Sequence, residues 1–118
     1  MSARNRLVGA WGESMAADYL QARGYRVIAR NARTPYGEID LVAEKDDLTI
    51  FVEVKTRAST TLGPPEMAVT PRKQAHMLAA AEHYSQKHAI EHWQIDVMAV
   101  SRRTGMDPDI THFERALE

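Results

Sequence analysis

The spacing of hydrophobic residues changes along the chain from three or four to two and back, and this predicts a mixed α/β fold. Apolar residues at 7–23 fall on one stripe at helical spacing, and Gly24 stands where a helix C-cap is expected. Three segments of alternating residues follow, at about 25–30, 36–43 and 48–56, and each predicts a strand. The first half of the chain therefore reads as a helix followed by three strands.

The second half repeats the change of spacing. After a loop with Gly-Pro-Pro at 63–65, Thr70 is a good N-cap and Pro71 a good first residue for a helix that runs to about Lys87. Alternation at 93–100 predicts a fourth strand, and 109–113 predicts a fifth. The order α-β-β-β-α-β-β favours a mixed sheet with helices packed on it.

Charged residues recur at every second position in the two strands before this loop. Glu38 and Asp40 share one face of the segment 36–43, opposite an apolar face made of Ile39, Leu41 and Ala43. Glu53, Lys55 and Arg57 share one face of the next strand, whose centre, Ile50-Phe51-Val52, is apolar on both faces. Glu53 and Lys55 therefore emerge from a strand that we expect to be covered on both sides.

The polar segment 44–47 predicts a hairpin turn between these strands. If Asp46 and Asp47 are the turn residues, Lys45 faces Leu48, and Asp40 and Glu38 fall opposite Glu53 and Lys55. Carboxylates placed so are about 5 Å apart at Cβ and repel each other, and a divalent cation between them would relieve the repulsion. Neither turn residue is Gly, so a longer loop or a bulge stays open, and a slip of one residue would move one strand's acids to the other face.

Two further polar residues lie on apolar helix stripes. Glu13 stands among alanines and a leucine, where burial without a partner is costly, and Gln74 lies in the first turn of the second helix on its apolar stripe. Glu13, Asp40, the Glu53–Lys55 pair and Gln74 are therefore expected to converge from four elements. The alternatives are a solvated acidic edge, a buried ion pair of Glu13 with Lys55 or an arginine, and an exposed Gln74.

The composition mainly excludes certain kinds of site and of protein. The 118 residues indicate one domain, 1–118, with an ordinary apolar content of 44%. Zero cysteines exclude disulfides and thiolate metal sites, and the spacing of the five histidines indicates no histidine metal site. The absence of an apolar run of about 18 residues or of a secretory signal favours a cytoplasmic protein without membrane contact. A net charge of −1 means that any site for a polyanion must be local.

The acids and their surroundings resemble a known family. Asp40, followed after twelve residues by Glu53-Val54-Lys55, resembles the PD-(D/E)xK nuclease core, whose element order is also α-β-β-β-α-β. Over about residues 9–100 the chain resembles more closely the YraN-like family of bacterial proteins, related in fold to Holliday-junction resolvases. The motifs that carry this resemblance are Gly12-Glu13, Gly24-Tyr25, Asn31-Ala32-Arg33, Gly37-Glu38-Ile39-Asp40-Leu41, Phe51 to Arg57 and Thr70 to Gln74. Two departures are Ile39 in place of the motif's proline and Gln94-Ile95-Asp96 in place of Arg-Phe-Asp.

The resemblance implies a restriction-endonuclease-like fold, a role for each acid, and a homodimer. Asp40, Glu53 and the Val54 carbonyl would bind Mg²⁺ or Mn²⁺, and Glu13 would complete the metal site. Lys55 would orient or activate the attacking water, and Gln74 would be the catalytic residue that some members add on the second helix.

These roles predict a Mg²⁺-dependent endonuclease that acts on DNA, in preference to RNA, and selects branched structure rather than sequence. Cations around the site are expected to bind the flanking phosphates: Arg33, Arg57, Arg72 and Lys73, with Arg30 beside them. Thr70 to Lys73 is the best of these segments, because a helix N-terminus also offers free N–H groups to phosphate. Two alternatives stay open: a non-catalytic nucleic-acid-binding module, and an interaction protein in which the charges form a structural ion network.

Overall fold

The structure of the chain is a computed structural model that describes residues 3–57, 70–102, 105 and 107–117. Its elements are α1 (Ala3–Ala22), β1 (Arg26–Thr34), β2 (Gly37–Lys45), β3 (Leu48–Arg57), α2 (Pro71–Lys87), β4 (Trp93–Ser101) and β5 (Asp109–Leu117). The predicted order of elements is confirmed, and the expected loop at 63–65 lies outside the described residues. Within the described part, no helix is long and apolar enough to cross a membrane.

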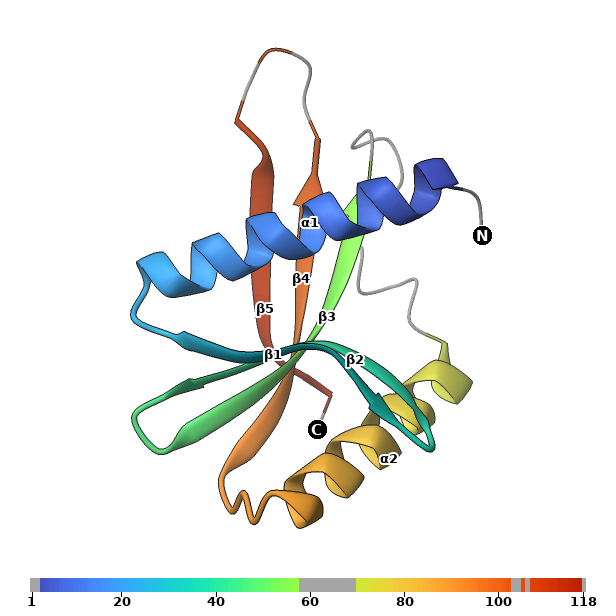
Figure 1. The fold of residues 1–118 in the computed structure, drawn as a ribbon, viewed down its shortest axis with the longest axis vertical. Coiled ribbons are helices and arrows are strands. Elements are labelled where there is room, and N and C mark those ends of the chain that lie inside the picture. Colours follow the sequence, from blue (N-terminus) through green and yellow to red (C-terminus); the bar gives the residue numbers. More distant parts are fainter. Residues whose placement is uncertain (1–2, 58–69, 103–104, 106, 118) are drawn as a thin grey trace.

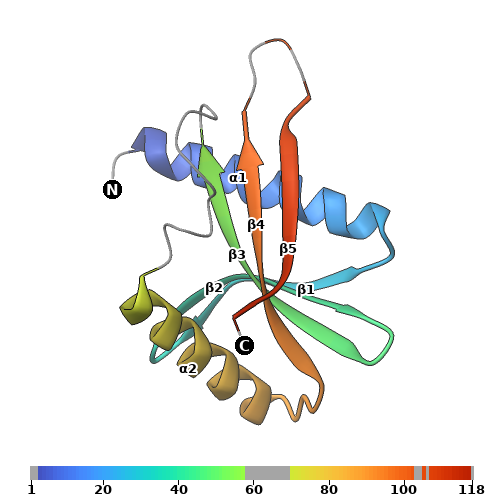
Figure 2. The same ribbon diagram turned by 180° about the vertical axis from the view of Figure 1, so that it is seen from behind.

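The five strands form one mixed sheet in the order β1-β2-β3-β4-β5. The β3–β4 pair is parallel and the other pairs are antiparallel. A parallel pair needs a crossover connection, and the segment that contains α2 supplies it. Figures 1 and 2, taken from opposite sides, show α1 across one face of the sheet and α2 on the other, so the chain is an α/β protein with helices on both faces.

Each helix has its own apolar cluster against the sheet. Ala16, Ala17 and Leu20 of α1 pack on Ile50 and Val52 of β3, whereas α2 packs on the cluster that contains Phe51. Alternate residues of β3 thus reach opposite helices, and all three β3 residues named are at most 2% exposed. The prediction of a strand covered on both faces is confirmed. Thr70 caps α2 as predicted, because its side chain accepts a hydrogen bond from the Lys73 amide.

The backbone of α1 comes close to β3 at Gly12. A Cβ built on this residue would lie 1.9 Å from Thr56 Oγ1 and 3.0 Å from the Thr56 Cβ, so the contact has room only for glycine. Gly12 precedes Glu13, and Thr56 follows Lys55. The close approach therefore fixes how the acid of α1 is placed against the charged end of β3.

Gly12→Ala is expected to lower the free energy of unfolding by about 1–3 kcal/mol, because the added methyl group forces α1 away from β3. Gly9→Ala is the matched control, since nothing lies within 4 Å of a Cβ at Gly9 and alanine is the better helix former by about 1 kcal/mol. Urea denaturation of both variants measures the difference. Equal stability of the two would contradict the close contact.

The hairpin between β2 and β3 has the predicted register as far as its ladder runs. The predicted cross-strand pairs of Asp40 with Glu53 and of Glu38 with Lys55 are not among the described pairs, because β2 and β3 separate before these residues. Lys45 pairs with Leu48, Asp46 has a φ of 55° in the two-residue turn, and the pairing continues to Leu41↔Val52. One expectation about the faces of β2 is wrong. Ile39 packs in the cluster under α2, while Leu41 packs in the cluster under α1.

A local irregularity in β1 accompanies this difference in β2. The neighbouring strand carries Asn31, with a φ of 51°, between the pairs Arg30↔Leu41 and Ala32↔Ile39, which places it across from Asp40. A left-handed residue breaks the regular pleat, so strict alternation does not hold through this point. The irregularity lies at the position of the first acid of the motif.

Candidate functional site

Asp40, the first acid of the motif, lies where β2 and β3 separate. The β2–β3 ladder ends at Leu41↔Val52 among the described pairs, after which β3 continues beside β4 and β2 continues beside β1. At this fork Asp40 Oδ2 accepts a hydrogen bond of 2.8 Å from the Val54 amide. The Asp40 carboxylate thus binds the backbone N–H of Val54 on β3. This bond holds Asp40 beside the residues that follow Val52.

Two lysines from different elements contact the second acid. Glu53 Oε1 lies 3.4 Å from Lys55 Nζ on the same strand and 2.8 Å from Lys73 Nζ in the first turn of α2. The Glu53 and Lys55 side chains are only 12% and 20% exposed. Because these charges are largely shielded from water, their interactions are stronger than those of a surface pair.

The pKa of Asp40 depends on acids from two other elements, Glu53 on β3 and Glu13 on α1. Burial, next the negative charge of Glu53 and, to a smaller extent, the charge of Glu13 on α1 raise the pKa of Asp40 from 3.8 to about 7. The hydrogen bond from the Val54 amide works in the opposite direction. The charges of Glu53 and Glu13 therefore both act on Asp40, and the convergence of these acids with Gln74 stays a prediction.

The two lysines respond in opposite directions. Burial, helped by the neighbouring Lys73, lowers the pKa of Lys55. Burial also works to lower the pKa of Lys73, but the contacts with Glu53 and Lys55 outweigh it, and the pKa is raised. Lys55 is thus the group of this pair that gives up a proton more readily, and Lys73 is the fixed positive charge.

The other predicted site residues include Gln74, Arg33 and Arg57. Gln74 is half-buried in the first turn of α2, one residue after Lys73, and its catalytic role stays a prediction. Arg33 is exposed and pairs with Glu38 at 3.6 Å, while Arg57 is half-buried at the end of β3. Sequence reasoning placed Lys73 among phosphate-binding residues and did not foresee its ion pair with Glu53, because that contact depends on how α2 lies against the sheet.

A pocket of about 440 Å³ adjoins the cluster, between the start of β2 and the first half of α2; we call it the β2–α2 pocket. Asp40 and Glu53 form part of its wall, and Arg72 and Lys73 of α2 line it as well. Apolar side chains supply much of the remaining lining: Ile39, Phe51, Val52, Met77, Ala80 and Ile95. The charged cluster therefore opens into an apolar space of the size that small-ligand sites have.

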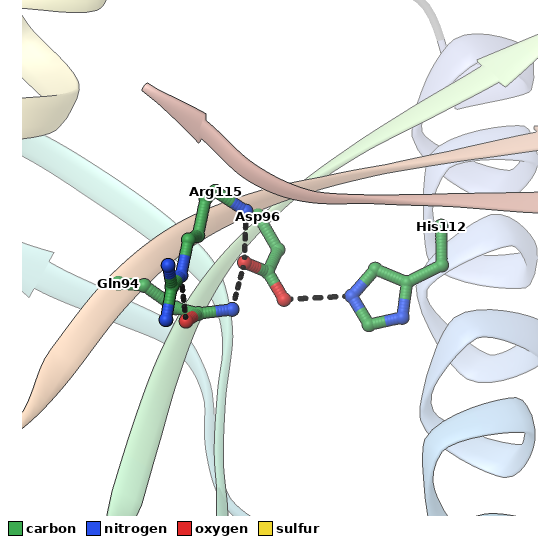
Figure 3. A network of polar contacts seen from close by, with 4 residues as sticks. All are labelled: Gln94, Asp96, His112 and Arg115. Carbon is green, nitrogen blue, oxygen red and sulfur yellow. Dashed lines mark hydrogen bonds and ion pairs between the residues drawn. The ribbon is translucent and has the colours of Figure 1, made fainter. Parts of the chain in front are cut away.

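A second polar group surrounds Asp96 on β4 (Figure 3). Asp96 is fully buried, and its Oδ1 accepts hydrogen bonds from Gln94 Nε2 at 2.9 Å and from the Arg115 amide at 3.0 Å. Its Oδ2 lies 2.7 Å from His112 Nε2. The pairing of β4 with β5 is irregular at this point, and Arg115 has a φ of 51°. Asp96 thus satisfies the amide of a bulge in β5, which explains why the strand extends beyond the predicted 109–113.

The sequence-based conclusion that no histidine belongs to a metal-binding group needs correction. Asp96, His112 and Glu114 offer ligand atoms that all lie within 4.8 Å of one another, so the group has the composition of a metal site. In the described residues, the carboxylates of Glu13, Asp40 and Glu53 do not all meet within that distance. Sequence spacing missed the group because its members lie on two strands that pair across a bulge. The available signal was an aspartate in the apolar run of β4.

Asp96→Ala is expected to lower the free energy of unfolding by about 2 kcal/mol, because it removes a fully buried carboxylate and leaves the partly buried Arg115 amide without this acceptor. Urea denaturation in EDTA measures this without a contribution from bound metal. Asp18→Ala, an exposed aspartate on α1, is the control and should change stability by no more than about 0.5 kcal/mol. A loss for Asp96→Ala as small as that of the control would show that the bulge does not depend on this carboxylate.

The fold and the cluster define a small mixed α/β protein with acidic and basic side chains gathered at a strand fork. The model of the uncharacterised protein family UPF0102 matches residues 12–100, and the chain belongs to this family. The resemblance to the YraN-like proteins is therefore confirmed. The matched segment contains Glu13, Asp40, Glu53, Lys55 and Lys73.

Curated relatives agree with this assignment. A UPF0102 protein of Syntrophomonas wolfei is 58% identical over 77 residues, which are 65% of this chain and 67% of the relative. UPF0102 proteins of Dehalococcoides mccartyi and Syntrophotalea carbinolica are 43% and 42% identical, over 85% and 94% of this chain and 84% and 91% of the relatives. Among solved structures, SfsA of Pyrococcus furiosus in complex with Ca²⁺ matches with 19% identity and a TM-score of 0.45, over 93% of this chain and 63% of SfsA.

Proposed function

We propose that the chain is a metal-dependent endonuclease that hydrolyses phosphodiester bonds in DNA and selects branched structures. The observation that carries this proposal is the meeting of Asp40, Glu53 and Lys55 at the fork between β2 and β3, where α1 and α2 add Glu13 and Lys73. The order α1-β1-β2-β3-α2-β4 matches the one that the resemblance to PD-(D/E)xK nucleases implies, and β5 follows it as an edge strand. A protein with this activity would work in the cytoplasm, where its substrate lies.

The donor atoms of the site fit Mg²⁺ or Mn²⁺. Both ions prefer oxygen ligands, and Mg²⁺ is usually held by one or two carboxylates while it keeps several waters. Asp40 and Glu53, with the Val54 carbonyl and Glu13, would supply such a set. The raised pKa of Asp40 supports this assignment, since it comes from burial and then from the repulsion by Glu53, and a cation would relieve that repulsion. When bound, such a cation lowers the pKa of water and polarises the phosphate.

The residues of the chain would divide the remaining work. Lys55, whose pKa is lowered, would hold the attacking water and pass a proton at Nζ. Lys73 would place a permanent positive charge beside the phosphate oxygens, where negative charge develops. Gln74, in the same turn of α2, would orient the water or the phosphate by hydrogen bonds.

Cations near the cluster would bind the flanking backbone. Arg72 lines the β2–α2 pocket beside the capped N-terminus of α2, and helix N-termini favour phosphate. Arg33 and Arg57 would contact phosphates further away, on the sides of β1 and β3. With a net charge of −1, such contacts would be confined to this side of the molecule.

Isothermal titration of Mg²⁺ and Mn²⁺ tests the metal site. Wild type is expected to bind and Asp40→Ala to lose that binding, because Asp40 is the carboxylate at the fork. A parallel titration of His112→Ala separates this site from the Asp96–His112–Glu114 group, and its binding should match that of wild type. Metal binding that survives Asp40→Ala but is lost in His112→Ala would assign the ion to the other group and end this proposal.

One observation favours a second candidate, a structural ion network. Glu53 is already paired with both Lys55 and Lys73, which is what such a network would display. A non-catalytic nucleic-acid-binding module is the remaining alternative. Mobility shifts with branched and linear DNA in EDTA, with cleavage measured separately in Mn²⁺, distinguish that module from a nuclease.

A further inference from the structure

Phosphate hydrolysis leaves the apolar part of the β2–α2 pocket unexplained. The charged cluster provides every group that a phosphodiester needs, yet it opens onto Ile39, Phe51 and Ile95 of the sheet and Met77 and Ala80 of α2. Charged backbone phosphates gain nothing from such a surface. A ligand that fills this space must therefore carry an apolar face next to its phosphate.

An exposed aromatic side chain is among the residues that line this space. Tyr36, in the turn between β1 and β2, lines the pocket and is 52% exposed, although large apolar residues are usually covered. Its ring lies edge-on to that of His83 on α2, with centroids 6.1 Å apart, so the hairpin turn is held beside the helix. Exposed aromatic rings next to cationic side chains are the usual platform on which unpaired bases stack.

Polar and charged side chains that line the pocket match the edge of a base and its attached phosphate. Glu38, Thr70 and His76 line the pocket and offer donors and acceptors for the edge of a base. Arg72 and Lys73 carry the positive charge that an attached phosphate requires, on the side where Asp40 and Glu53 lie. An apolar peptide side chain would match the apolar lining but would not account for these charged side chains.

We propose that the β2–α2 pocket takes one unpaired nucleobase of the DNA, adjacent to the phosphate held at the strand fork. This inference rests on the proposed nuclease function and names what that function would select. A base inside a duplex has both faces stacked and must be flipped out at a cost of a few kcal/mol. The pocket therefore favours bulges and single-stranded flaps, where a base is already free.

Binding without cleavage tests the pocket. Asp40→Asn in EDTA is titrated with a duplex that carries one bulged 2-aminopurine and with a duplex in which the same base is paired. The bulged duplex is expected to bind about tenfold more tightly, because only its free base can stack in the pocket, and the fluorescence of the base reports its surroundings.

Substitutions of exposed residues that line the pocket test whether the preference for the bulged base arises there. Tyr36→Ala, introduced beside Asp40→Asn, is expected to remove most of the preference, and His76→Ala, at a second exposed position, part of it. Leu78→Ala is the control, since Leu78 is 36% exposed on α2 but does not line the pocket. Equal binding of the two duplexes, or a preference unchanged by Tyr36→Ala, would overturn the proposal.

The two proposals fail in different ways. Preference for the bulged base without metal-dependent cleavage by wild type would end the nuclease function and leave a binding pocket for an unpaired base. Cleavage that is lost in Glu53→Gln but proceeds equally on bulged and paired DNA would keep the nuclease and end the pocket.

Discussion

Glu53→Gln is expected to lower Mg²⁺-dependent cleavage of branched DNA on the order of 10³-fold. Glutamine keeps the size of the side chain but removes the charge that would bind the cation. It also removes the ion pairs that hold Lys55 and Lys73 at 3.4 and 2.8 Å. Single-turnover cleavage of a labelled four-way junction, with linear duplex in parallel, measures the loss in Mg²⁺ and in Mn²⁺.

Glu44→Gln is the matched control for this experiment. Glu44 lies near the far end of β2, where it pairs with Arg26 on β1, away from the fork. Its replacement should leave the cleavage rate within about a factor of two of wild type, since surface ion pairs contribute little. Cleavage by Glu53→Gln at the wild-type rate would mean that the activity does not come from this site.

Asp40→Asn is expected to stabilise the metal-free protein above neutral pH. A carboxyl whose pKa is raised on folding favours the folded state at low pH, and that stability is lost as the pH rises from about 4 through about 7. Each factor of ten in acidity corresponds to about 1.4 kcal/mol, so the variant gains up to about 4 kcal/mol at pH 8. The asparagine oxygen can still accept the Val54 amide hydrogen bond.

Thermal unfolding at pH 4 and pH 8, with and without Mg²⁺, measures this effect. At pH 4 wild type and Asp40→Asn should unfold at similar temperatures, and at pH 8 the variant should have the higher Tm in EDTA. Mg²⁺ should raise the Tm of wild type at pH 8 and leave the variant unchanged, because only a native state that binds metal is stabilised by it. A variant that is less stable at pH 8, with no response to metal in either protein, would support the structural ion network.

Local sequence signals predicted most of the fold. Thr70 and Pro71 marked the start of α2, and two polar turn residues were enough to give the pairing of Lys45 with Leu48. These features depend on neighbours in sequence, such as the bonding of a cap to the amide three residues on. The sequence also indicated that Glu13 would act on the acids of the hairpin, since an acid on an apolar helix stripe needs a partner, and its charge does raise the pKa of Asp40.

Features that depend on contacts between distant elements could not be predicted. The change of face between Ile39 and Leu41 accompanies the left-handed Asn31 on the neighbouring strand, which no periodicity within β2 reveals. The ion pair of Lys73 with Glu53 requires the placement of α2 on the sheet. The network around Asp96 requires the bulge in β5, which is itself held by the Asp96 side chain.

The irregular backbone of β1 and β5 has a consequence for self-association. These are the two edge strands of the sheet, and each has a break in its register, at Val27/Ala29 in β1 and opposite Ile95/Val97 in β5. A bulged edge offers no straight row of amides and carbonyls to an incoming strand, so the sheet resists extension by another molecule. Any dimer of this protein should accordingly join through side chains rather than through a shared sheet, and the protein should withstand high concentration without forming fibrils.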